Sequence, residues 1–506
     1  MFVLLRDALT STMATVNVTQ MTLAVVTFGL VVHWVVKRNS VKLPHGPRPL
    51  PFFGNLWELN GIGLADKATE WKDKYGPVFT MYLGSKPTVV INSIEAMTEA
   101  FTTRGDDFAN RPHSVSQDAL TDNGKNIAFA DFSESLKFRR KNVMQSLRQY
   151  LTGSQHTERV HDVLEIAVDN IKQEKGPFDL ETHTFHIVCN VLHVLCFGRT
   201  LGIDDKDFLK LKMIFQSGIG EFGNTWEDVI PFLRHFPTKH FRHFLNINNE
   251  FLAYIQKGVH ERRANLNEND STTLIDDILL TQQKLAKEKN STLQAAFTDS
   301  HITQTLSDVF FAGIDTTRLT LGWIFLYLAL NPDVQKKVQT EIDDIVGDAV
   351  PGREHRPGLV YTEAVILEIM RLFPVAPMGL PHETVRDTQV MGYDIPAKTE
   401  VMANQYAILR DPNHWDQPES FVPERYLDKD GGKLTLKPKS WIPFSIGQRS
   451  CVGEFLARQS ILYITTGLLQ KLDFSLDPNT PADLTPQVGF VFRACKPFKV
   501  IAKSRR

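Results

Sequence analysis

The chain has few cysteines, and their spacing fits neither a disulfide framework nor a zinc site. Its 506 residues include four of them, at Cys189, Cys196, Cys451 and Cys495. Four scattered cysteines are too few to stabilise a chain of this length by disulfide bonds. The absence of a Cys-x-x-Cys pair disfavours structural zinc. The cysteine content therefore indicates a reducing compartment for the body of the protein.

A large excess of charge of either sign is also missing. Lys and Arg total 56 and Asp and Glu total 58, which gives a formal net charge of −2. Such a balance provides no global attraction to a phosphate backbone, so we expect no nucleic-acid partner. The hydrophobic share of 42% and the charged share of 23% are those of an ordinary globular protein with one large core or two.

The stretch 21–36 lacks charged side chains altogether. Extended back to residue 16, it reaches the roughly 20 residues that a helix needs to cross a bilayer. Basic residues follow it at Lys37, Arg38 and Lys42, and the positive-inside rule then predicts that the C-terminal bulk is cytosolic. The missing small-residue cleavage site favours a retained signal anchor over a cleaved signal peptide, and a buried N-terminal helix is the other alternative.

Four prolines in positions 44–51 predict a stiff, extended connector after the anchor, because proline fixes its own backbone and restrains the preceding residue. We therefore divide the chain into three parts. They are an N-terminal membrane anchor and its flank at 1–41, a proline-rich hinge at 42–56, and the main domain at 57–506.

Helical periodicity dominates the main domain, and no repeat of 20 to 50 residues suggests a solenoid. Amphipathic patterns predict helices at 93–103, 136–152, 155–175, 185–197, 249–264, 301–330 and 333–346. Shorter β-rich pieces predict strands at 78–83, 88–92, 390–392 and 500–502. The polar stretch 265–290 is typical of a mobile connector. The fold class is therefore mainly α with small β-sheets.

The strongest chemical signal is the segment 444–453, FSIGQRSCVG. A cysteine thiolate can be the axial ligand of haem iron, and Gly447 and Gly453 would allow the backbone to approach the ring. Arg449 could pair with a haem propionate, and Phe444 could shield the sulfur of Cys451 from water. A lone buried cysteine is usually a small hydrophobe, but the five residues recur at these spacings by chance only about once in ten thousand such chains.

This segment resembles the haem-binding loop of the cytochrome P-450 family, and other landmarks of the family follow in order. Glu368 and Arg371 match the family's ExxR pair, whose i, i+3 spacing puts both charges on one helix face. Arg425, in FVPERY at 421–426, resembles the arginine that completes a buried ion network with that pair. An ExxR alone is weak, since exposed helical ion pairs are common and contribute only about 0.3 to 0.5 kcal/mol.

The segment 310–317, FFAGIDTT, resembles the oxygen-activating helix of the family. Ala312 and Gly313 would leave room for oxygen and substrate above the iron. The resemblance makes Thr316 the catalytic alcohol and Asp315 its proton feeder, since an acid beside an alcohol can relay protons. The alternative is a Thr-rich helix face with a capping aspartate.

Two further positions concern the haem propionates. The family usually carries a WxxxR pair there, and this chain has Leu136 and Arg140. Arg140 keeps the basic contact, whereas Leu136 cannot donate a hydrogen bond as an indole would. His382 falls where the family has another propionate partner, with a plain turn residue as the alternative.

The resemblance also implies a substrate cavity, lined by Ala312, Val375, Ala376, Met378 and Val488. Apolar side chains suit a lipophilic guest, although a packed core would have the same sequence. The segment 373–382 and the region 448–459 look most like the branch with steroid 17-hydroxylases and drug-metabolising enzymes. Among steroids, fatty acids and foreign compounds, this slightly favours a steroid.

The implied function is that of a haem-thiolate monooxygenase of the endoplasmic reticulum membrane. It would insert one atom of O2 into a lipophilic small molecule, with electrons from NADPH through a flavoprotein reductase. The basic run at 137–141 resembles a docking surface for that acidic donor, and a solvated face is the alternative. A haem-thiolate isomerase or a non-catalytic haem carrier would not need the pair of Asp315 and Thr316.

Overall fold

The computed structural model describes residues 42–505, except for 52, 60–61, 153, 217–224, 268–270, 289–290, 436–437 and 490. Before residue 42 it describes only 21–23, 25 and 29. Apart from these, the membrane anchor predicted at 16–36 lies outside the described residues. The division of the chain at residues 41 and 56 stays a prediction.

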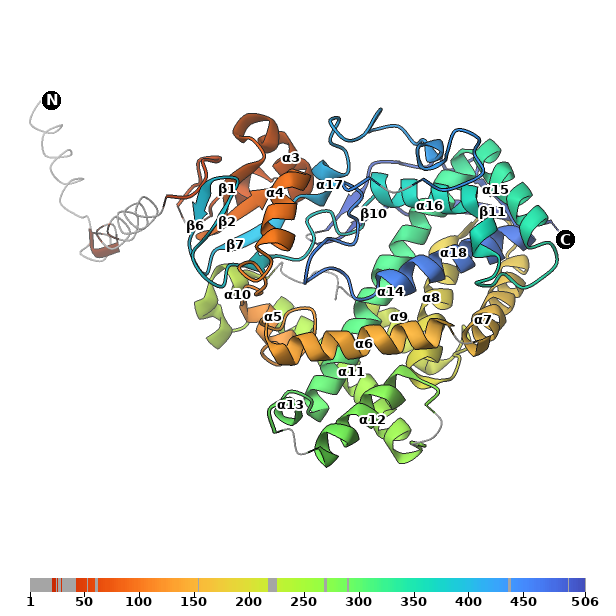
Figure 1. Cartoon of the computed structure of the whole chain (residues 1–506), viewed down its shortest axis with the longest axis horizontal. Coiled ribbons are helices and arrows are strands. Elements are labelled where there is room, and N and C mark those ends of the chain that lie inside the picture. The colour runs from red at the N-terminus through yellow and green to blue at the C-terminus, as the bar shows by residue number, and fades with distance from the viewer. Residues whose placement is uncertain are drawn as a thin grey trace, which may run out of the picture.

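Helices make up most of the described chain, which confirms the mainly α class (Figure 1). The helices are α3 (Leu64–Tyr75), α4 (Ile94–Thr98), α5 (Val115–Leu120), α6 (Glu134–Thr152), α7 (Ser154–Lys172), α8 (Leu180–Phe197), α9 (Lys206–Gln216), α10 (Trp226–Val229), α11 (Lys239–Ala264), α12 (Leu274–Lys287), α13 (Ser291–Ala295), α14 (Asp299–Leu330), α15 (Pro332–Ile345), α16 (Val360–Leu372), α17 (Gln405–Ile408) and α18 (Glu454–Lys471). Short 3₁₀ or π turns are η1 (Leu56–Glu58), η2 (Glu99–Thr103), η4 (Pro231–His235), η5 (Arg356–Gly358) and η6 (Pro423–Tyr426).

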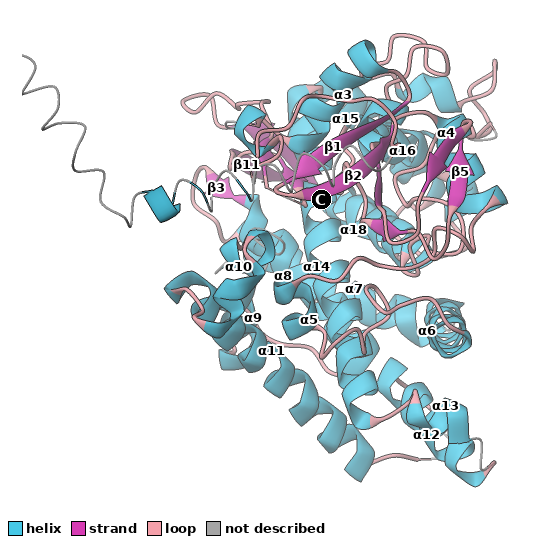
Figure 2. Cartoon of the chain, turned by 90° about the vertical axis from the view of Figure 1, so that its left-hand side faces the viewer, coloured by secondary structure: helices cyan, strands magenta, loops and turns pink. Residues whose placement is uncertain are grey.

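The strands form small sheets that gather in the upper part of the view in Figure 2. They are β1 (Val78–Leu83), β2 (Lys86–Ile91), β3 (Phe178–Asp179), β4 (His382–Glu383), β5 (Thr388–Val390), β6 (Tyr393–Ile395), β7 (Glu400–Ala403), β8 (Leu472–Leu476), β9 (Gln487–Val488), β10 (Arg493–Ala494) and β11 (Lys499–Ser504). One sheet has the order β1-β2-β7-β4, with β2 and β7 parallel. The other orders are β3-β11-β8, β10-β9 and β5-β6.

Helix α14 is the centre of the molecule. It packs against α8, α11, α15, α16 and α18, and large side chains such as Trp323, Phe325 and Phe310 are fully buried along it. It is long and apolar enough to cross a membrane, but 61% of its most apolar window is buried inside the protein. It is therefore the central core helix of the protein, and it also carries the segment 310–317.

The expected mobile connector at 265–290 was wrong, because α12 occupies most of it. Thr273 caps this helix in a reciprocal capping box with Asp276, a recognised start signal. Ile275, Ile278 and Leu279 are buried on one face of the helix. The polar residues that suggested a connector lie on the other faces of an amphipathic helix.

The proline-rich segment lies along β1. Pro44 and Pro47 are buried, and a Cβ added at Gly46 would lie 1.9 Å from the carbonyl oxygen of Thr80. Glycine is required at this close approach of two backbones. The segment is thus seated on the sheet at the start of the main domain.

Candidate active site

The loop before α18 presents Cys451. The backbone N–H of Cys451 donates to the carbonyl oxygen of Phe444 at 3.0 Å, which closes the loop. Gly447 has a φ of +79°, and a Cβ there would lie 1.8 Å from the carbonyl oxygen of Phe101. Gly453 is the N-cap residue of α18. Backbone geometry thus requires glycine at 447, whereas a Cβ at Gly453 would lie 3.8 Å from the Cys451 sulfur, which is an ordinary contact.

Cys451 differs from the other cysteines in its surroundings. It is exposed, whereas Cys189 and Cys196 are buried. Desolvation by surrounding protein nevertheless raises the pKa of its thiol, and hydrogen bonding from Gly453 opposes that rise. Of these three cysteines, Cys451 is therefore the one that is open to a ligand.

The middle of α14 also has an accessible surface. Ala312 is exposed although it lies in the central helix, and the Thr316 hydroxyl donates to its carbonyl oxygen at 2.6 Å. Gly313 serves a different purpose from the one expected, since a Cβ there would lie 2.8 Å from Leu192 of α8. Of the two small residues, Ala312 leaves part of the helix surface accessible, and Gly313 allows α8 to pack closely against α14.

Asp315 belongs to a chain of ion pairs. Its carboxylate lies 2.8 Å from Nε of Arg318, and Nη1 of Arg318 lies 2.6 Å from the carboxylate of Glu181 on α8. Burial raises the pKa of Asp315, and Arg318 opposes that shift. The Glu181 side chain is 46% exposed, so the three charges lead from the buried helix to the surface.

Three arginines, Arg111, Arg140 and Arg449, come together although they are distant in sequence. Their guanidinium groups donate to backbone carbonyl oxygens. In the described part of the chain none of them forms an ion pair with a carboxylate, and the Nε of Arg449 is buried without a partner.

Mutual repulsion acts within this set, which we call the arginine cradle. Burial lowers the pKa of Arg449 to about 9, with Arg140 as the next cause. Burial also lowers the pKa of Arg111, again with contributions from Arg449 and Arg140. Buried cations normally have carboxylate partners, so the donor chemistry of the cradle fits a ligand with two carboxylates. Haem is such a ligand, and the cradle lies beside the Cys451 loop, because Arg140 donates to the carbonyl oxygen of Ser450 at 2.6 Å.

His382 is buried and stacks on Phe101 with ring centroids 3.9 Å apart. Its Nδ1 lies 2.7 Å from the carbonyl oxygen of Phe108, which can only accept. Burial, followed by the charges of Arg111 and Arg449, lowers its pKa well below the usual value. Because a carbonyl oxygen can only accept, Nδ1 carries a proton, and a role of His382 toward a propionate stays a prediction.

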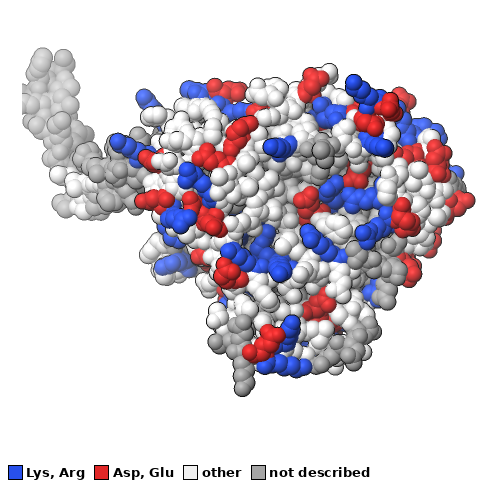
Figure 3. Space-filling view, viewed as in Figure 1, with Lys and Arg blue, Asp and Glu red and all other residues white. Residues whose placement is uncertain are grey.

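The run at 137–141 divides between two faces of α6. Lys137 and Lys141 are exposed, whereas Arg139 is buried and Arg140 belongs to the cradle. The expected basic docking surface is therefore only half present on this helix. Figure 3 shows Lys and Arg interspersed with Asp and Glu over this face of the molecule. Leu136 is fully buried in the main core.

The ExxR pair forms a closed, buried network. Nε and Nη2 of Arg371 donate to the two carboxylate oxygens of Glu368 at 2.8 and 2.9 Å. Arg425 donates to Glu368 as well, at 3.1 Å. The remaining donors of Arg371 reach the carbonyl oxygens of Leu409, Pro418 and Ser420. The structure thus brings together the three residues of this motif.

The residues expected to line a substrate cavity have three different surroundings. Val375 and Ala376 are half-buried and Ala312 is exposed. Met378 instead packs in a second core cluster beside the β1-β2 sheet. Val488 is exposed on β9, where it lies against Gly63.

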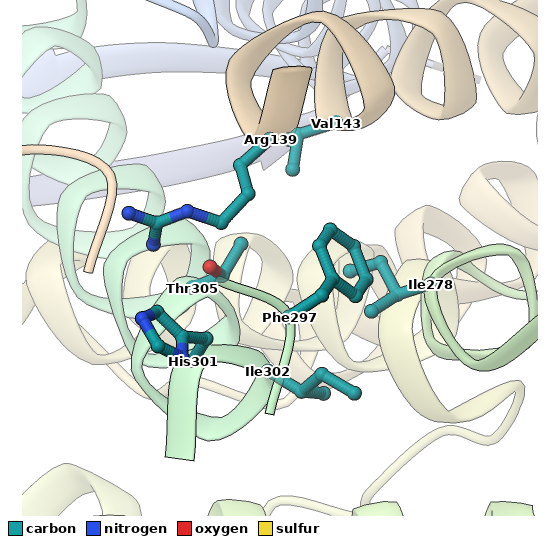
Figure 4. Close-up of a pocket in the computed structure, with 7 residues that line it drawn as sticks. All are labelled: Arg139, Val143, Ile278, Phe297, His301, Ile302 and Thr305. Carbon is teal, nitrogen blue, oxygen red and sulfur yellow. The ribbon is translucent and has the colours of Figure 1, made fainter. Parts of the chain in front are cut away.

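A small cavity of about 10 Å³ lies between α6, α12 and α14. Figure 4 shows Arg139 extending from α6 toward Thr305 and His301 of α14, with Phe297 and Ile278 beside it. Its volume suits at most a single water molecule. It is an internal packing defect, separate from the proposed site.

Comparison with known proteins agrees with this geometry. The family model described as Cytochrome P450 matches residues 44–501. The chain belongs to the cytochrome P450 family. It is 34% identical to the steroid 17-alpha-hydroxylase/17,20 lyase of Rattus norvegicus over 482 residues, which are 92% of this chain and 94% of the relative. It is 32% identical to the cytochrome P450 1A1 of Chelon auratus over 500 residues, which are 94% and 95% of the two chains.

Membership confirms several expectations about this P450. The protein is a haem-thiolate monooxygenase, its cofactor is haem bound through a cysteine thiolate, and it uses O2 and lipophilic substrates. The resemblance to microsomal members, including the steroid-hydroxylase branch, is also confirmed.

Sequence reasoning missed two residues of the site. Arg111, in ANRP at 109–112, belongs to no pattern that distinguishes it from a surface arginine. Arg318 follows Asp315 by three residues, and that i, i+3 spacing was a usable signal for an ion pair. Their contacts with distant elements are visible only in the folded chain.

Proposed function

We propose that this P450 is a monooxygenase anchored in the endoplasmic reticulum membrane, which hydroxylates a steroid with electrons from an NADPH-dependent flavoprotein reductase. The observation that carries the proposed site is the arginine cradle beside the Cys451 loop. A ligand that has a metal ion for the Cys451 thiolate and two carboxylates for the arginines fits this arrangement.

In this proposal Cys451 would hold the haem iron, and Arg111, Arg140 and Arg449 would hold the two propionates. Bound in this way, haem supplies the iron that binds and activates O2. A cysteine binds a metal as the thiolate, so Cys451 would hold the iron in its deprotonated form. Arg140 favours the resulting thiolate through its charge.

Proton delivery is assigned to α14. Thr316 holds its proton in the hydrogen bond to the carbonyl oxygen of Ala312 and can pass it to a group above that position. Asp315 is buried with a raised pKa and is linked through Arg318 to the exposed Glu181. Rotation of the Asp315 side chain away from Arg318 would carry a proton inward from the surface.

Replacing Thr316 tests this assignment. Thr316→Ala should divert most electrons from NADPH into reduced oxygen, with product per NADPH falling by about a hundredfold if the hydroxyl acts in proton transfer. Thr320→Ala is the matched control, since Thr320 makes the same kind of bond to the carbonyl oxygen of Thr316 at 2.8 Å. Unchanged coupling in Thr316→Ala would favour a haem carrier, and turnover without NADPH would favour an isomerase.

The substrate class is supported by the steroid 17-alpha-hydroxylase relatives, which cover nearly the whole chain, and by the apolar residues Ala312, Val375 and Ala376. A difference spectrum of the ferric protein, titrated with steroids, fatty acids and planar aromatics, tests it. A spin-state shift with steroids at the lowest concentrations is expected. A shift only with aromatics or fatty acids would contradict the steroid assignment.

Membrane attachment is supported by an exposed surface of the main domain as well as by the apolar stretch at 16–36. Trp226, Phe232 and Phe236 are 60%, 66% and 69% exposed. Exposed basic residues follow at Arg234, Lys239 and Arg242, and no acidic residue occurs from 229 to 249. Aromatic and basic side chains together suit a bilayer interface.

Flotation with liposomes separates the two contributions. The full chain should float with liposomes even in high salt, and a chain lacking residues 1–41 should float only at low salt. Phe232→Asp with Phe236→Asp should abolish the residual binding of the truncated chain. Salt-resistant flotation of the truncated chain would contradict the assignment of 16–36 as the main anchor.

Docking of the reductase is assigned to a surface that includes the exposed Lys137 and Lys141. Lys137→Glu with Lys141→Glu should lower the association rate at low salt, because steering by exposed charges is screened by ions. Substrate binding is the control and should be unchanged. Equal salt dependence of turnover in the variant and the wild type would exclude this surface.

A further inference from the structure

The segment 125–130, which we call the strap, runs between α14 and the arginine cradle. Its carbonyl oxygens face guanidinium groups. Arg449 donates to Ala128 and Ala130 at 2.8 Å each, and Arg111 donates to Ala128 at 3.0 Å. Arg139, the residue that Figure 4 shows reaching across to α14, donates to Lys125 and Asn126 at 2.5 and 3.0 Å.

The opposite side of the strap is held by one carboxylate, Asp308 of α14. Its Oδ2 accepts from the backbone N–H of Ile127 at 2.8 Å and from that of Ala128 at 2.9 Å. Its Oδ1 accepts from the Asn126 side chain at 2.8 Å. Ala128 therefore connects Asp308, through its N–H, with both Arg111 and Arg449, through its carbonyl oxygen.

Asp308 is a buried carboxylate that is held by hydrogen bonds and not by an ion pair. In the described part of the chain no Lys, Arg or His forms an ion pair with it. Burial raises its pKa to about 6, against the lowering by its hydrogen bonds and by the charge of Arg139. Its own charge favours the charged forms of Arg139, Arg140 and Arg449. The carboxylate thus supports the cradle in two ways, through its hydrogen bonds to the strap and through the attraction of its charge to the arginines.

We infer that Asp308 is a positioning residue, which fixes the strap to α14 and thereby holds Arg111 and Arg449 in place for the two carboxylates of the cofactor. This inference rests on the cradle proposed above. Asp308 also connects the helix that carries Ala312 and Thr316 to the arginines that would bind the propionates. It thereby fixes the position of this helix relative to the cradle. An asparagine could not replace the carboxylate fully. Its one oxygen could accept from the two backbone N–H groups of the strap, but its NH2 group would then face the NH2 group of Asn126, which would lose its acceptor.

Haem transfer to an excess of apomyoglobin tests the inference. Asp308→Asn should lose haem about tenfold faster than the wild type, in line with the effect of removing an outer partner of a cofactor ligand. Asp122→Asn is the matched control, because Asp122 also joins this part of the chain to α14, through Ser300, at 2.6 Å. The control should lose haem at the wild-type rate. Wild-type behaviour of Asp308→Asn, or equal losses in both variants, would overturn the inference.

A second readout distinguishes positioning from a general loss of structure. Removing the negative charge of Asp308 should by itself raise the reduction potential of the haem, whereas misplaced cradle arginines should lower it. We expect a lowered potential in Asp308→Asn. A raised or unchanged potential would contradict the positioning role. If Asp308→Asn does not fold, Asp308→Glu retains the charge and should show intermediate haem loss, and wild-type haem loss in Asp308→Glu would overturn the role of precise placement.

The same assay separates this inference from the proposed cradle. If Arg449→Ala retains haem like the wild type, the cradle itself is wrong. If Arg449→Ala loses haem and Asp308→Asn does not, the cradle stands and the role of Asp308 is wrong.

Discussion

Two buried groups of arginines in this molecule differ in how their charge is balanced. Arg371 and Arg425 share the carboxylate of Glu368, and Arg371 and Glu368 are completely buried. Arg111, Arg140 and Arg449 have only carbonyl oxygens as direct partners in the described part of the chain. Both groups are held in place by the surrounding backbone, but only the first contains a carboxylate partner. In this sense we call the first network complete and the second incomplete.

The difference separates a structural role from a binding role. A buried ion pair with all its hydrogen bonds made keeps a unique local geometry, at little net gain in stability. A buried set of cations that lower one another's pKa is costly until an anion binds. We therefore assign the first network to the stability of the fold and propose that the second binds the cofactor.

The largest effect is expected from breaking the complete network. Glu368→Ala leaves Arg371 and Arg425 buried without their carboxylate, which should cost about 3 to 5 kcal/mol of unfolding free energy. Denaturant unfolding measures it. Glu424→Ala, which removes an exposed carboxylate that pairs with Lys337, should change stability by less than about 1 kcal/mol. Similar losses in the two variants would contradict the contrast.

A smaller and different effect is expected from the incomplete network. Arg449→Ala should weaken haem binding by about 10 to 100-fold, while the unfolding free energy falls less than in Glu368→Ala because the repulsion with Arg140 is relieved. Haem transfer and denaturant unfolding measured on the same preparation check both parts. Loss of stability without loss of haem affinity would reverse the roles assigned to the two networks.

Restoring the usual tryptophan of the family should not help this chain. Leu136 is fully buried, so Leu136→Trp overfills a packed core and should cost about 1 to 3 kcal/mol. Arg111 already supplies a donor to the cradle. Thermal unfolding and haem transfer test this expectation, and slower haem loss with unchanged stability would show that an indole was missing.

The smallest effect on stability is expected from the exposed ion pairs of His113. His113 lies 2.7 Å from Asp118 and 3.5 Å from Asp131, and these carboxylates raise its pKa. The stabilisation is therefore complete below the ordinary pKa of about 6.5 and is lost as the pH rises through the raised value. Because the side chain is 47% exposed, His113→Asn should cost less than about 1 kcal/mol at pH 5.5 and almost nothing at pH 9. A cost that grows with pH would contradict this sign.

The sequence was most informative where chemistry depends on local spacing. The loop around Cys451, the pair of Glu368 and Arg371, and the helix with Ala312 and Thr316 are each defined within one short segment. Helices α6, α14 and α15 were predicted within two residues at all their ends.

What could not be predicted depends on contacts between distant segments. Arg111 joins Arg449 only after α14, the strap and the Cys451 loop have packed together, and no pattern around residue 111 signals it. Met378 was expected in a cavity and lies instead in the second core cluster, since apolar residues look alike in either place. Helix α11 begins ten residues before its expected start, because its basic first turns are exposed and mask the periodicity.

The most direct test of the account is the absorption spectrum of the ferrous carbon monoxide complex, recorded for the wild type, Cys451→Ser and Arg449→Ala. We predict that the wild type absorbs at the wavelength after which the family is named and that Cys451→Ser does not, even when it retains haem. Arg449→Ala should show the wild-type position with lower haem content. The characteristic band in Cys451→Ser would contradict the assignment of Cys451 as the iron ligand.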